Sequence, residues 1–542
     1  MTFASDPLTG RTHRTLWFSV LALVLILFAL ASGQQALAQA GNDAWFGVPT
    51  PAQRQNIGSP PSQYVPVAAA DLSLRTGGEE LPAEMLGGNN IARYMQDIIA
   101  ISQQSKAAGD ALWGRIGGTE WELMTAQYMA EKFRLFGLAD VRIDRMPRNP
   151  QWWPTAWEVT LLADESYGSG SRDIPLLTAF PGVPSPSTPE SGIDAELIYV
   201  GAGTPADLLG RDVTGKIAVY HAIFESGAYS YTGRGLADQL IKAGALAAIA
   251  VHDIEANIQF FNRFVGSEAG PGFTISGDDG VFLEQIIVHT AETKPLRARI
   301  KLISGPRDGL ITQNTYGMIP GQSDETVILT AHTDAYFDGA YDNASGLATL
   351  LALAEYYSRP GAPTPQRNLL FVGSGGHHAG RPGTPYTNTG LQSVGTAYMV
   401  ENYPQLMDDT VLVLNVEHTA LTAVVTGLGG IINTTTETAR HLAVSNRSPF
   451  LLENFLAAID RYGVIVPTMT NHFPGGDASN FLRAEIPVVN LISAGFWYHS
   501  SGDILENIPV QGLERTARMF AYFLDRVDSA SRVEIGTGAP GN

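Results

Sequence analysis

The chain has 542 residues, enough for two or three domains with large cores. Its formal net charge of −19 argues against a nucleic-acid partner, because phosphate binding requires clustered Lys and Arg. The chain has no cysteine, which excludes disulfide bonds, thiolate metal ligands and cysteine nucleophiles. Any metal ion must therefore be held by His, Asp and Glu side chains.

The first 40 residues have the three-part layout of a secretory signal peptide. Arg11 and Arg14 precede an apolar run at 16–31, and small residues then alternate from Ala36 to Ala40. The apolar run is shorter than the about 20 residues that a membrane-spanning helix requires. We therefore expect an exported protein, periplasmic or secreted, with a membrane link only through this segment if it is not cleaved.

The composition and the hydrophobic pattern change twice in the next part of the chain. Residues 41–85 are rich in Pro, Gly, Gln and Ala and are predicted to be an extended, loosely structured lead-in. Apolar residues at 126, 129, 130 and 133 lie on one helical face, and Gly137 is predicted to end that helix. Between 189 and 301, strands at "AELIYVG" and "GKIAVY" and a helix at "LADQLIKAG" predict a separate small α/β module.

From about residue 310 the pattern becomes regular. The continuous apolar runs "TVILTAH", "RNLLFVG", "DTVLVLNVEH" and "IPVVNLIS" are typical of central strands buried on both faces. Helical stretches such as "NASGLATLLALAEYY" lie between them. Alternating strands and helices predict an α/β fold with a doubly wound, mostly parallel sheet.

Candidate metal ligands fall where these strands end. A lone histidine at a strand end is more often a structural residue than a ligand. Here, however, four strands each deliver a candidate to one edge of the sheet, which is where open α/β sheets form their sites. An acidic residue also lies in a polar loop just before a helix. The candidates are His332, Asp342, His377, His378, Glu417 and His499.

Several ordered segments resemble the co-catalytic zinc aminopeptidases, the superfamily that includes glutamate carboxypeptidases and glutaminyl cyclases. "LTAHTDAYFDGAYDNASGLATLLALAEYY" resembles its first metal motif, and "HFPGGDASNFLRAEIPVVNLISAGFWYHSSGD" resembles its last. "GRIGGTEWELMTAQYMAEKFRLFGL" is similar to the helix that opens the catalytic domain. The resemblance implies a catalytic domain at 86–188 and 302–535, with a protease-associated domain inserted at 189–301.

The resemblance also implies roles for single residues. One ion is bound by His332 and the other by His499, Asp342 bridges the two, and Glu417 is the acidic ligand. Asp334 supports His332, an outer-sphere arrangement that the His-x-Asp spacing also favours. Tyr498 helps to stabilise the tetrahedral intermediate, and the peptide bond after Asp342 is expected to be cis.

One departure from the family pattern affects the chemistry. The family carries two adjacent glutamates after its "F-V" strand, a general base and then a metal ligand, where this chain has His377 and His378. A neutral imidazole can bind metal and can accept a proton. We therefore expect His378 as a ligand and His377 as the base. With two carboxylate ligands in place of three, the second ion is expected to bind less tightly.

These patterns predict a zinc-dependent exopeptidase with two ions, acting on peptides or small amides from the free amino end. A hydroxide bound to the metal would attack the scissile carbonyl. Two alternatives stay open: a degenerate, peptidase-like binding protein, which the His377-His378 pair favours, and a glutaminyl cyclase-like acyltransferase with one zinc. His418 and His472 are interpreted as structural histidines. Phe496, Trp497 and Tyr498 suit a pocket wall or a core equally well.

Overall fold

The computed structural model describes most of the chain from residue 84 onward. The described ranges are 84–168, 170–222, 235–252, 257–261, 265–290, 294–378, 393–427, 430–437, 441–444, 448–466, 468–470, 476–492 and 495–536. The predicted signal peptide and nearly all of the predicted lead-in therefore lie outside the described residues. Within these ranges, no helix combines the length and the apolar character needed to cross a membrane.

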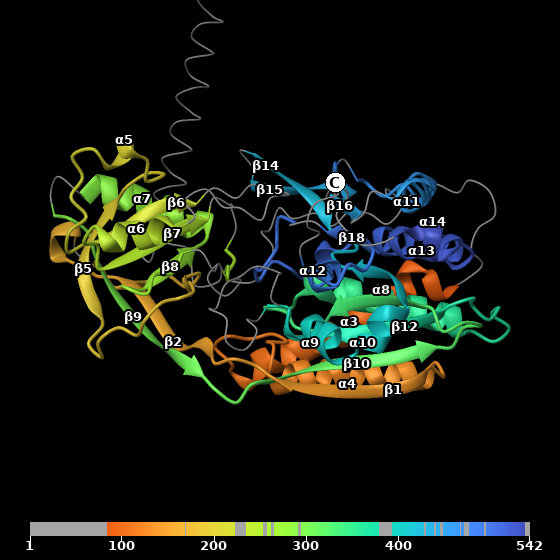
Figure 1. Cartoon of the computed structure of the whole chain (residues 1–542). Coiled ribbons are helices and arrows are strands. Elements are labelled where there is room, and N and C mark those ends of the chain that lie inside the picture. The colour runs from red at the N-terminus through yellow and green to blue at the C-terminus, as the bar shows by residue number, and fades with distance from the viewer. Residues whose placement is uncertain are drawn as a thin grey trace, which may run out of the picture. The chain divides into compact units, whose positions relative to one another are not determined.

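The first sheet has eight strands in the order β1-β10-β12-β11-β13-β18-β16-β17 (Figure 1). The four central strands run parallel to one another, whereas β1–β10, β10–β12 and β18–β16 pair antiparallel. The doubly wound α/β fold is thus confirmed, and its parallel part is the centre that the apolar runs predicted. The strands are β1 (Ala139–Pro147), β10 (Ile311–Ile319), β12 (Asn368–Ser374), β11 (Thr326–His332), β13 (Thr410–Val416), β18 (Val488–Ile492), β16 (His441–Val444) and β17 (Thr468–Thr470).

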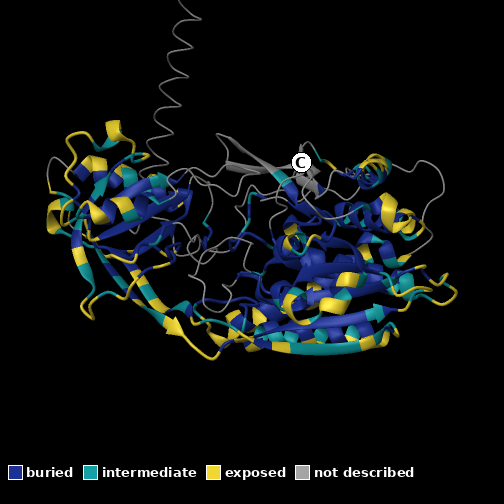
Figure 2. Ribbon diagram, in the orientation of Figure 1, coloured by how far each residue is buried: buried dark blue, intermediate teal, exposed yellow. Residues whose placement is uncertain are grey.

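Helices cover both faces of this sheet. Alternate residues of β11 enter different cores, with Val327 and Leu329 on one face and Ile328 on the other. The central strands are accordingly buried throughout (Figure 2), as expected for strands that face two apolar layers. The first face packs against α3 (Gly88–Ala108), α4 (Glu120–Leu135), α8 (Ser345–Ser358), α11 (Pro449–Tyr462) and α13 (Val510–Asp528). The second packs against α9 (Val394–Asn402), α10 (Pro404–Asp409) and α12 (Ala478–Arg483).

Helix α4 shows how local sequence sets an element's ends. Its first turn carries Glu120 and Glu122 and its last turn Lys132 and Arg134, charges that oppose the helix dipole at each end. Gly137 follows with a φ of 78°, a left-handed conformation that favours glycine. The predicted stop at Gly137 is confirmed.

A second eight-stranded sheet has the order β3-β2-β9-β5-β6-β7-β8-β4. Strands β5 to β8 are parallel; α5 (Pro205–Leu208) and α6 (Leu236–Lys242) lie between them in sequence, and α7 (Gly277–Thr290) follows β8. The sheet is wider than the predicted insert, because β2 pairs antiparallel with β9 from Gln151↔Arg307 to Leu161↔Ala298. Its strands are β2 (Gln151–Leu161), β3 (Ile174–Pro175), β4 (Phe180–Pro181), β5 (Ile193–Tyr199), β6 (Ile217–Ala222), β7 (Ala247–His252), β8 (Gly272–Ile275) and β9 (Arg297–Arg307).

The short segment Ala163–Arg172 groups apart from the rest of the described chain by compactness. It contains a single turn of helix, η3 (Glu165–Tyr167). The carboxylate of Asp164 starts this turn by accepting a hydrogen bond from the backbone N–H of Ser166, the usual way in which a side chain satisfies a free helical donor.

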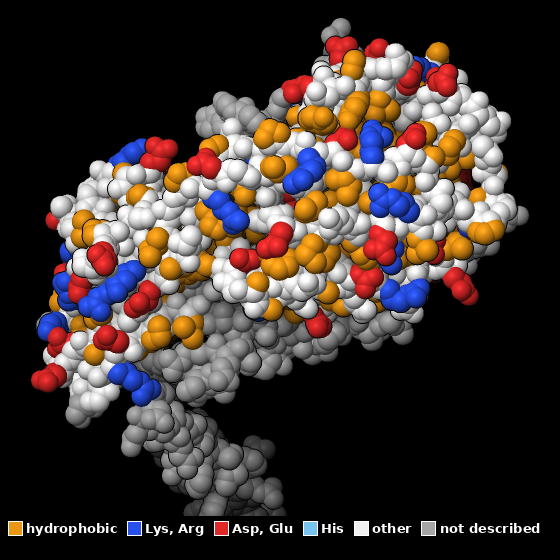
Figure 3. All heavy atoms as spheres, turned by 90° about the horizontal axis from the view of Figure 1, so that it is seen from below, with side chains coloured by type: hydrophobic (Ala, Val, Ile, Leu, Met, Phe, Trp, Pro, Cys, Tyr) orange, Lys and Arg blue, Asp and Glu red, His pale blue; other side chains and the backbone are white. Residues whose placement is uncertain are grey.

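One face of the molecule carries charges of both signs. Figure 3 shows acidic and basic side chains interspersed over the face seen from below, with apolar side chains scattered between them. Neighbouring charges of opposite sign cancel much of each other's field. The acidic excess of the chain is therefore not gathered on this face.

Candidate metal centre

The five predicted metal ligands meet at the carboxyl edge of the central strands. β11 ends at His332, and Glu417 directly follows β13. His378 and His499 come from the loops after β12 and β18. Asp342 lies in the short helix η4 (Ala340–Ala344), and its peptide bond to Asn343 is cis, as the resemblance implied. All five side chains are buried.

Three donor atoms form a first group. Nε2 of His499 lies 3.1 Å from Oδ2 of Asp342 and 3.1 Å from Nε2 of His378. The third separation, between Nε2 of His378 and Oδ2 of Asp342, is 3.4 Å. Such nearly equal separations are those of donor atoms arranged around one point.

A second group uses the other oxygen of the same aspartate. Nε2 of His332 lies 3.0 Å from Oδ1 of Asp342 and 3.6 Å from Oε1 of Glu417. Asp342 therefore offers one carboxylate oxygen to each group, which is the geometry of a carboxylate that bridges two ions.

The donor atoms fit divalent metal ions better than they fit a hydrogen-bond network. Nε2 of His332 and both oxygens of Asp342 are buried and form no hydrogen bond. Burying such groups without compensation costs about 1–3 kcal/mol each, and more for charged groups. Imidazole nitrogens and carboxylate oxygens are ligands that zinc accepts. Two zinc ions sharing Asp342 would satisfy all of these atoms.

His377 lies beside these groups and contacts a residue outside them. Its ring stacks on that of His332, with centroids 4.0 Å apart, and its Nε2 is 3.9 Å from Oε1 of Glu417. Its Nδ1 lies 3.0 Å from Oδ1 of Asp477. Asp477 is itself buried, and its second oxygen accepts a hydrogen bond from the hydroxyl of Ser374.

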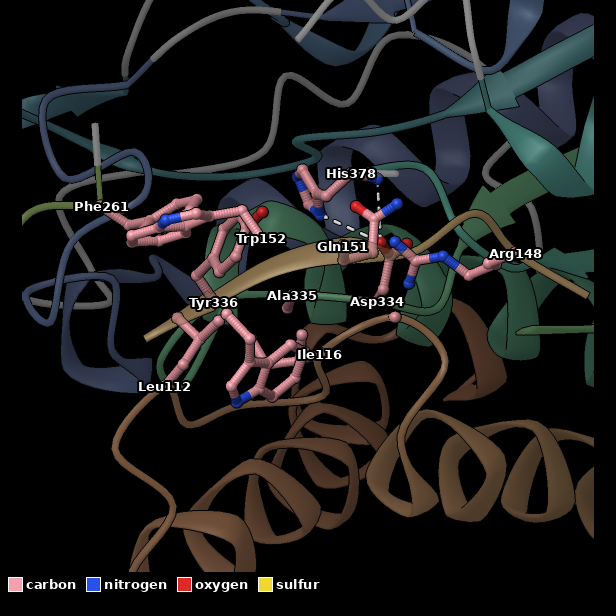
Figure 4. Close-up of a pocket in the computed structure, with 12 residues that line it drawn as sticks. Leu112, Ile116, Arg148, Gln151, Trp152, Phe261, Asp334, Ala335, Tyr336 and His378 are labelled. Carbon is pink, nitrogen blue, oxygen red and sulfur yellow. Dashed lines mark hydrogen bonds and ion pairs between the residues drawn. The ribbon is translucent and has the colours of Figure 1, made fainter. Parts of the chain in front are cut away.

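Asp334 lies beside His332, the residue that it was predicted to support. Its backbone carbonyl lies 3.0 Å from Nδ1 of His332, and its Oδ1 lies 3.7 Å from the same nitrogen. Its carboxylate also accepts the backbone N–H groups of His377 and His378, and Oδ2 lies 3.3 Å from Nδ1 of His378 (Figure 4). Burial raises the pKa of this carboxyl, but His378, His332 and His377 together outweigh burial and hold the pKa well below its usual range.

Two buried charged residues fix the loop that carries Asp342. Asp503 accepts hydrogen bonds from the backbone N–H groups of Tyr341 and Asp342, at 2.6 and 3.1 Å, while burial raises its pKa to about 8. The Arg115 guanidinium donates to three backbone carbonyls of the preceding loop, Thr333, Asp338 and Gly339. Burial lowers the pKa of Arg115 to about 10. The bridging aspartate is thus held in place by its backbone.

Glu122 is a buried carboxyl behind the loop that carries the two adjacent histidines. Its Oε1 accepts the backbone N–H of Gly376 at 2.8 Å, and its Oε2 accepts that of Gly118 at 2.6 Å. Burial, assisted by the charge of Asp334, raises its pKa to about 7. This side chain therefore ties helix α4 to the loop of His377 and His378.

A small pocket, with a cavity volume of about 20 Å³, opens beside His378 (Figure 4). Aromatic rings dominate its wall, and Arg148 brings a guanidinium group toward Gln151 and Asp334. The composition of this wall, apolar and aromatic side chains with a few polar groups, is that of ligand sites, although the cavity itself is smaller than such sites usually are. The lining residues are Leu112, Ile116, Gly117, Arg148, Gln151, Trp152, Trp153, Phe261, Asp334, Ala335, Tyr336 and His378.

The remaining candidates separate into core and site. Trp497 is fully buried in the core and Phe496 packs against that core. The ring of Tyr498 stacks on that of His499, with centroids 3.7 Å apart. His418, which the sequence favoured as structural, has its Nε2 3.3 Å from Oδ1 of Asp342. His472 lies outside the described residues.

Sequence reasoning missed Asp477 and Glu122 and gave too little weight to His418. Asp477 directly precedes α12 and Glu122 lies in α4, both far along the chain from the loop of His377 and His378, so no local spacing marks them. His418 did carry a signal, because it directly follows a residue at the end of a central strand.

Residues 257–261, which lie between β7 and β8 in sequence, form hydrogen bonds with the loop that carries His499. The backbone N–H of Phe261 donates to the carbonyl of His499, and that of Ser501 donates to the carbonyl of Gln259, both at 2.9 Å. The N–H of Gln259 in turn donates to the hydroxyl of Ser501. One candidate metal ligand, His499, is therefore held by hydrogen bonds from residues that do not belong to the first sheet.

The fold and the donor groups define a class, α/β proteins with a metal centre at the carboxyl edge of the central strands. Residues 314–524 match the profile of Peptidase family M28. Among curated proteins, no sequence matches this chain.

Solved structures share the fold. A zinc aminopeptidase from Bacillus subtilis is 21% identical, covering 84% of this chain and 98% of its own, with a TM-score of 0.56. A peptidase M28 precursor from Shewanella amazonensis SB2B is 18% identical, with coverages of 82% and 96% and a TM-score of 0.58. An aminopeptidase from Aneurinibacillus sp. strain AM-1 is 18% identical, with coverages of 84% and 95% and a TM-score of 0.50. The fold that the resemblance implies is shared with these structures, and residues 314–524, which hold all five candidate ligands, are similar to Peptidase family M28.

Proposed function

We propose that this protein is a zinc-dependent aminopeptidase that hydrolyses peptides or small amides from the free amino end. The observation that carries the proposal is the pair of buried donor groups that share Asp342 beside an aromatic pocket. His332 and Glu417 would hold one ion, His378 and His499 the other, and Asp342 both. The pocket would receive the side chain of the substrate's first residue.

The zinc ions would polarise the scissile carbonyl and make the attacking water more acidic. His377 would accept the proton of that water at Nε2, because its Nδ1 faces the carboxylate of Asp477. Asp334 would hold the backbone of the two adjacent histidines, and Tyr498 would assist the oxyanion. The loss of the family's glutamate base is thus offset by a histidine that a carboxylate orients.

We also propose that the protein works outside the cytoplasm, as a periplasmic or secreted enzyme. The support is the signal-peptide layout of residues 1–40. In the same reading, residues 189–301 are an inserted protease-associated domain.

A second candidate is a binding protein that retains metal but has lost hydrolysis. The observation in its favour is the replacement of both expected glutamates by His377 and His378. The site would then bind peptide termini through its ions and its pocket without turning them over.

Metal content and turnover, measured together on the chain lacking residues 1–40, separate the two candidates. Aminoacyl amides serve as substrates, with His377→Ala, His377→Glu and the exposed-site control His289→Ala as variants. Bound zinc, turnover lost in His377→Ala and turnover retained in His377→Glu and His289→Ala support the enzyme. Bound zinc without turnover of any substrate supports the binding protein. A protein that takes up no zinc when zinc is supplied contradicts both.

A further inference from the structure

His418 lies in an unusual backbone conformation next to the ligand Glu417. Its φ is 52°, in the left-handed region that residues other than glycine seldom adopt. Its side chain is only 1% exposed, and its ring stacks on that of Tyr341 with centroids 4.3 Å apart. Such strained conformations persist where the surrounding structure demands them and cluster at functional sites.

The imidazole of His418 points at the second donor group. Its Nε2 lies 3.3 Å from Oδ1 of Asp342 and 3.8 Å from Oε1 of Glu417. These are the two oxygens that Nε2 of His332 approaches at 3.0 and 3.6 Å. The two histidines therefore face the same pair of carboxylate oxygens.

These separations match a tetrahedral zinc site with four protein ligands. With zinc–ligand distances of roughly 2.0–2.1 Å, the donor atoms of a tetrahedron lie about 3.3 Å apart. Four of the six separations of such a tetrahedron are 3.0, 3.3, 3.6 and 3.8 Å in the second group, and they bracket that value. His418 is thus a candidate for a fourth donor at the second group, which His332, Asp342 and Glu417 form.

The first group has three protein donors. Its three separations of 3.1, 3.1 and 3.4 Å, between Asp342, His378 and His499, are those of one tetrahedral face. Structural zinc sites are usually closed by four protein ligands, whereas catalytic sites keep one position open. The two groups therefore differ in whether the bound ion would keep an open coordination position, which decides where substrate can bind.

We propose that His418 is a fourth protein ligand of the second ion, so that this ion is closed and the open coordination position lies at the first ion. The inference rests on the proposed two-zinc site and specifies which half of it is available to substrate. The second ion then holds Asp342, Glu417 and His332 in place, and the ion held by His378 and His499 receives the carbonyl of the substrate. The competing arrangement has His418 donating a hydrogen bond to Asp342 without touching the ion.

Zinc coordination distinguishes these arrangements without any measure of activity. X-ray absorption of the two-zinc protein reports the mean number of imidazoles per ion. Four histidines over two ions, His332, His378, His418 and His499, give a mean of two, whereas three histidines give a lower mean of about one and a half. If the wild-type protein has the lower mean number of imidazoles per ion, the proposal is wrong, whatever the variants show.

Competition of the metal-free protein with a chromophoric chelator gives the second test. His418→Ala should lower the affinity for one of the two zinc ions by more than the roughly 10–100-fold that loss of an outer-sphere partner causes. The affinity for the other ion should not change. His289→Ala, at an exposed position of α7, is the matched control. If His418→Ala binds two zinc ions with wild-type affinity, the proposal that His418 is a fourth ligand is wrong, but the proposed function is unaffected. A wild-type protein that binds no zinc would instead remove the proposed function on which it rests.

Discussion

His377 and Asp477 face each other across the edge of the sheet, with Nδ1 of the imidazole 3.0 Å from Oδ1 of the carboxylate. A carboxylate in this position keeps the proton on Nδ1 and leaves the lone pair of Nε2 available to accept another. In catalytic triads, a carboxylate bonded to Nδ1 fixes the tautomer and the orientation of the histidine in the same way. Asp477 is therefore a positioning residue for the proposed base.

The first prediction concerns this pair. Asp477→Asn should lower kcat by about 10²–10⁴-fold, the usual contribution of a positioned base, and leave KM and zinc content near wild type. Two residues that act as a unit are not additive. The double variant with His377→Ala should thus be no slower than His377→Ala alone, as steady-state kinetics would reveal. Independent, multiplying losses would show that Asp477 acts elsewhere.

The second prediction concerns removal of zinc. Without ions, the buried oxygens of Asp342 and Nε2 of His332 have no hydrogen-bond partner to replace them. Chelation should lower the thermal midpoint by about 5 °C or more, and added zinc should restore it, because a ligand that binds only the folded state stabilises that state. Calorimetry with and without chelator measures this. Asp342→Asn should respond much less, and an unchanged wild-type midpoint would contradict the site.

The third prediction concerns the close approach of Gly476 to the centre. Its φ is 55°, and a Cβ there would lie 2.9 Å from Oε2 of Glu417 and 3.5 Å from Cε1 of His377. Gly476→Ala should therefore lower zinc affinity and kcat together. Gly361→Ala is a matched control, since its φ of 79° carries a similar backbone cost with no atom within 4 Å. Equal effects of the two changes on zinc binding would rule out a local clash.

The fourth prediction concerns the pocket wall. Trp152 lines the pocket, and its indole N–H donates to the carbonyl of Ser185 at 2.7 Å. Trp152→Ala should reduce kcat/KM for leucyl and phenylalanyl amides by about 10-fold or more and affect the alanyl amide far less, because apolar contacts discriminate by about 1–3 kcal/mol. Parallel kinetics on the three amides measure this. A uniform loss would show that the pocket does not receive the substrate side chain.

The fifth prediction concerns His252, which is buried in β7 far from the proposed ligands in sequence and stacked on Phe260. Burial lowers its pKa from 6.5 to about 3. Between these values the unfolded chain takes up a proton that the folded chain does not. The stability contributed by His252 is therefore complete above pH 6.5 and is lost as pH falls toward 3, by up to about 1.4 kcal/mol per pH unit.

His252→Phe keeps the stacked ring and removes the titration. Relative to wild type, this variant should gain stability as pH falls from 7 to 5, as urea unfolding at several pH values would measure. Taking the difference between two zinc-loaded proteins cancels the pH dependence of zinc binding. His289→Gln, at an exposed position, should run parallel to wild type. Parallel curves for His252→Phe would contradict the prediction.

Sequence periodicity predicted the centre of the fold because buried parallel strands are written as continuous apolar runs. β11, β12, β13 and β18 are all such runs, and their ends placed His332, Glu417 and the two loops correctly. Strand β2 could not be assigned to its sheet, because Gln151–Leu161 has no regular alternation of buried and exposed residues, and its sequence does not show which strand it pairs with.

The sequence predicted which residue types lie at the strand ends, and therefore which side chains could form the candidate site. Which atom of a residue acts was not, since Asp334 offers its carbonyl to His332 and its carboxylate to His378. The partner of His377 was not predictable either. Asp477 lies 100 residues further along the chain, and only the folded sheet brings the two together.

The hydrogen bonds between Phe261 and His499, and between Gln259 and Ser501, have a consequence for the order of assembly. They join positions about 240 residues apart, and contacts of such long range form late in folding because loop closure comes before them. His499 is then oriented only after the strands around residues 247–275 have formed. The zinc ion bound by His499 would therefore report that these strands have formed, whereas the ion held by His332 and Glu417 does not depend on them.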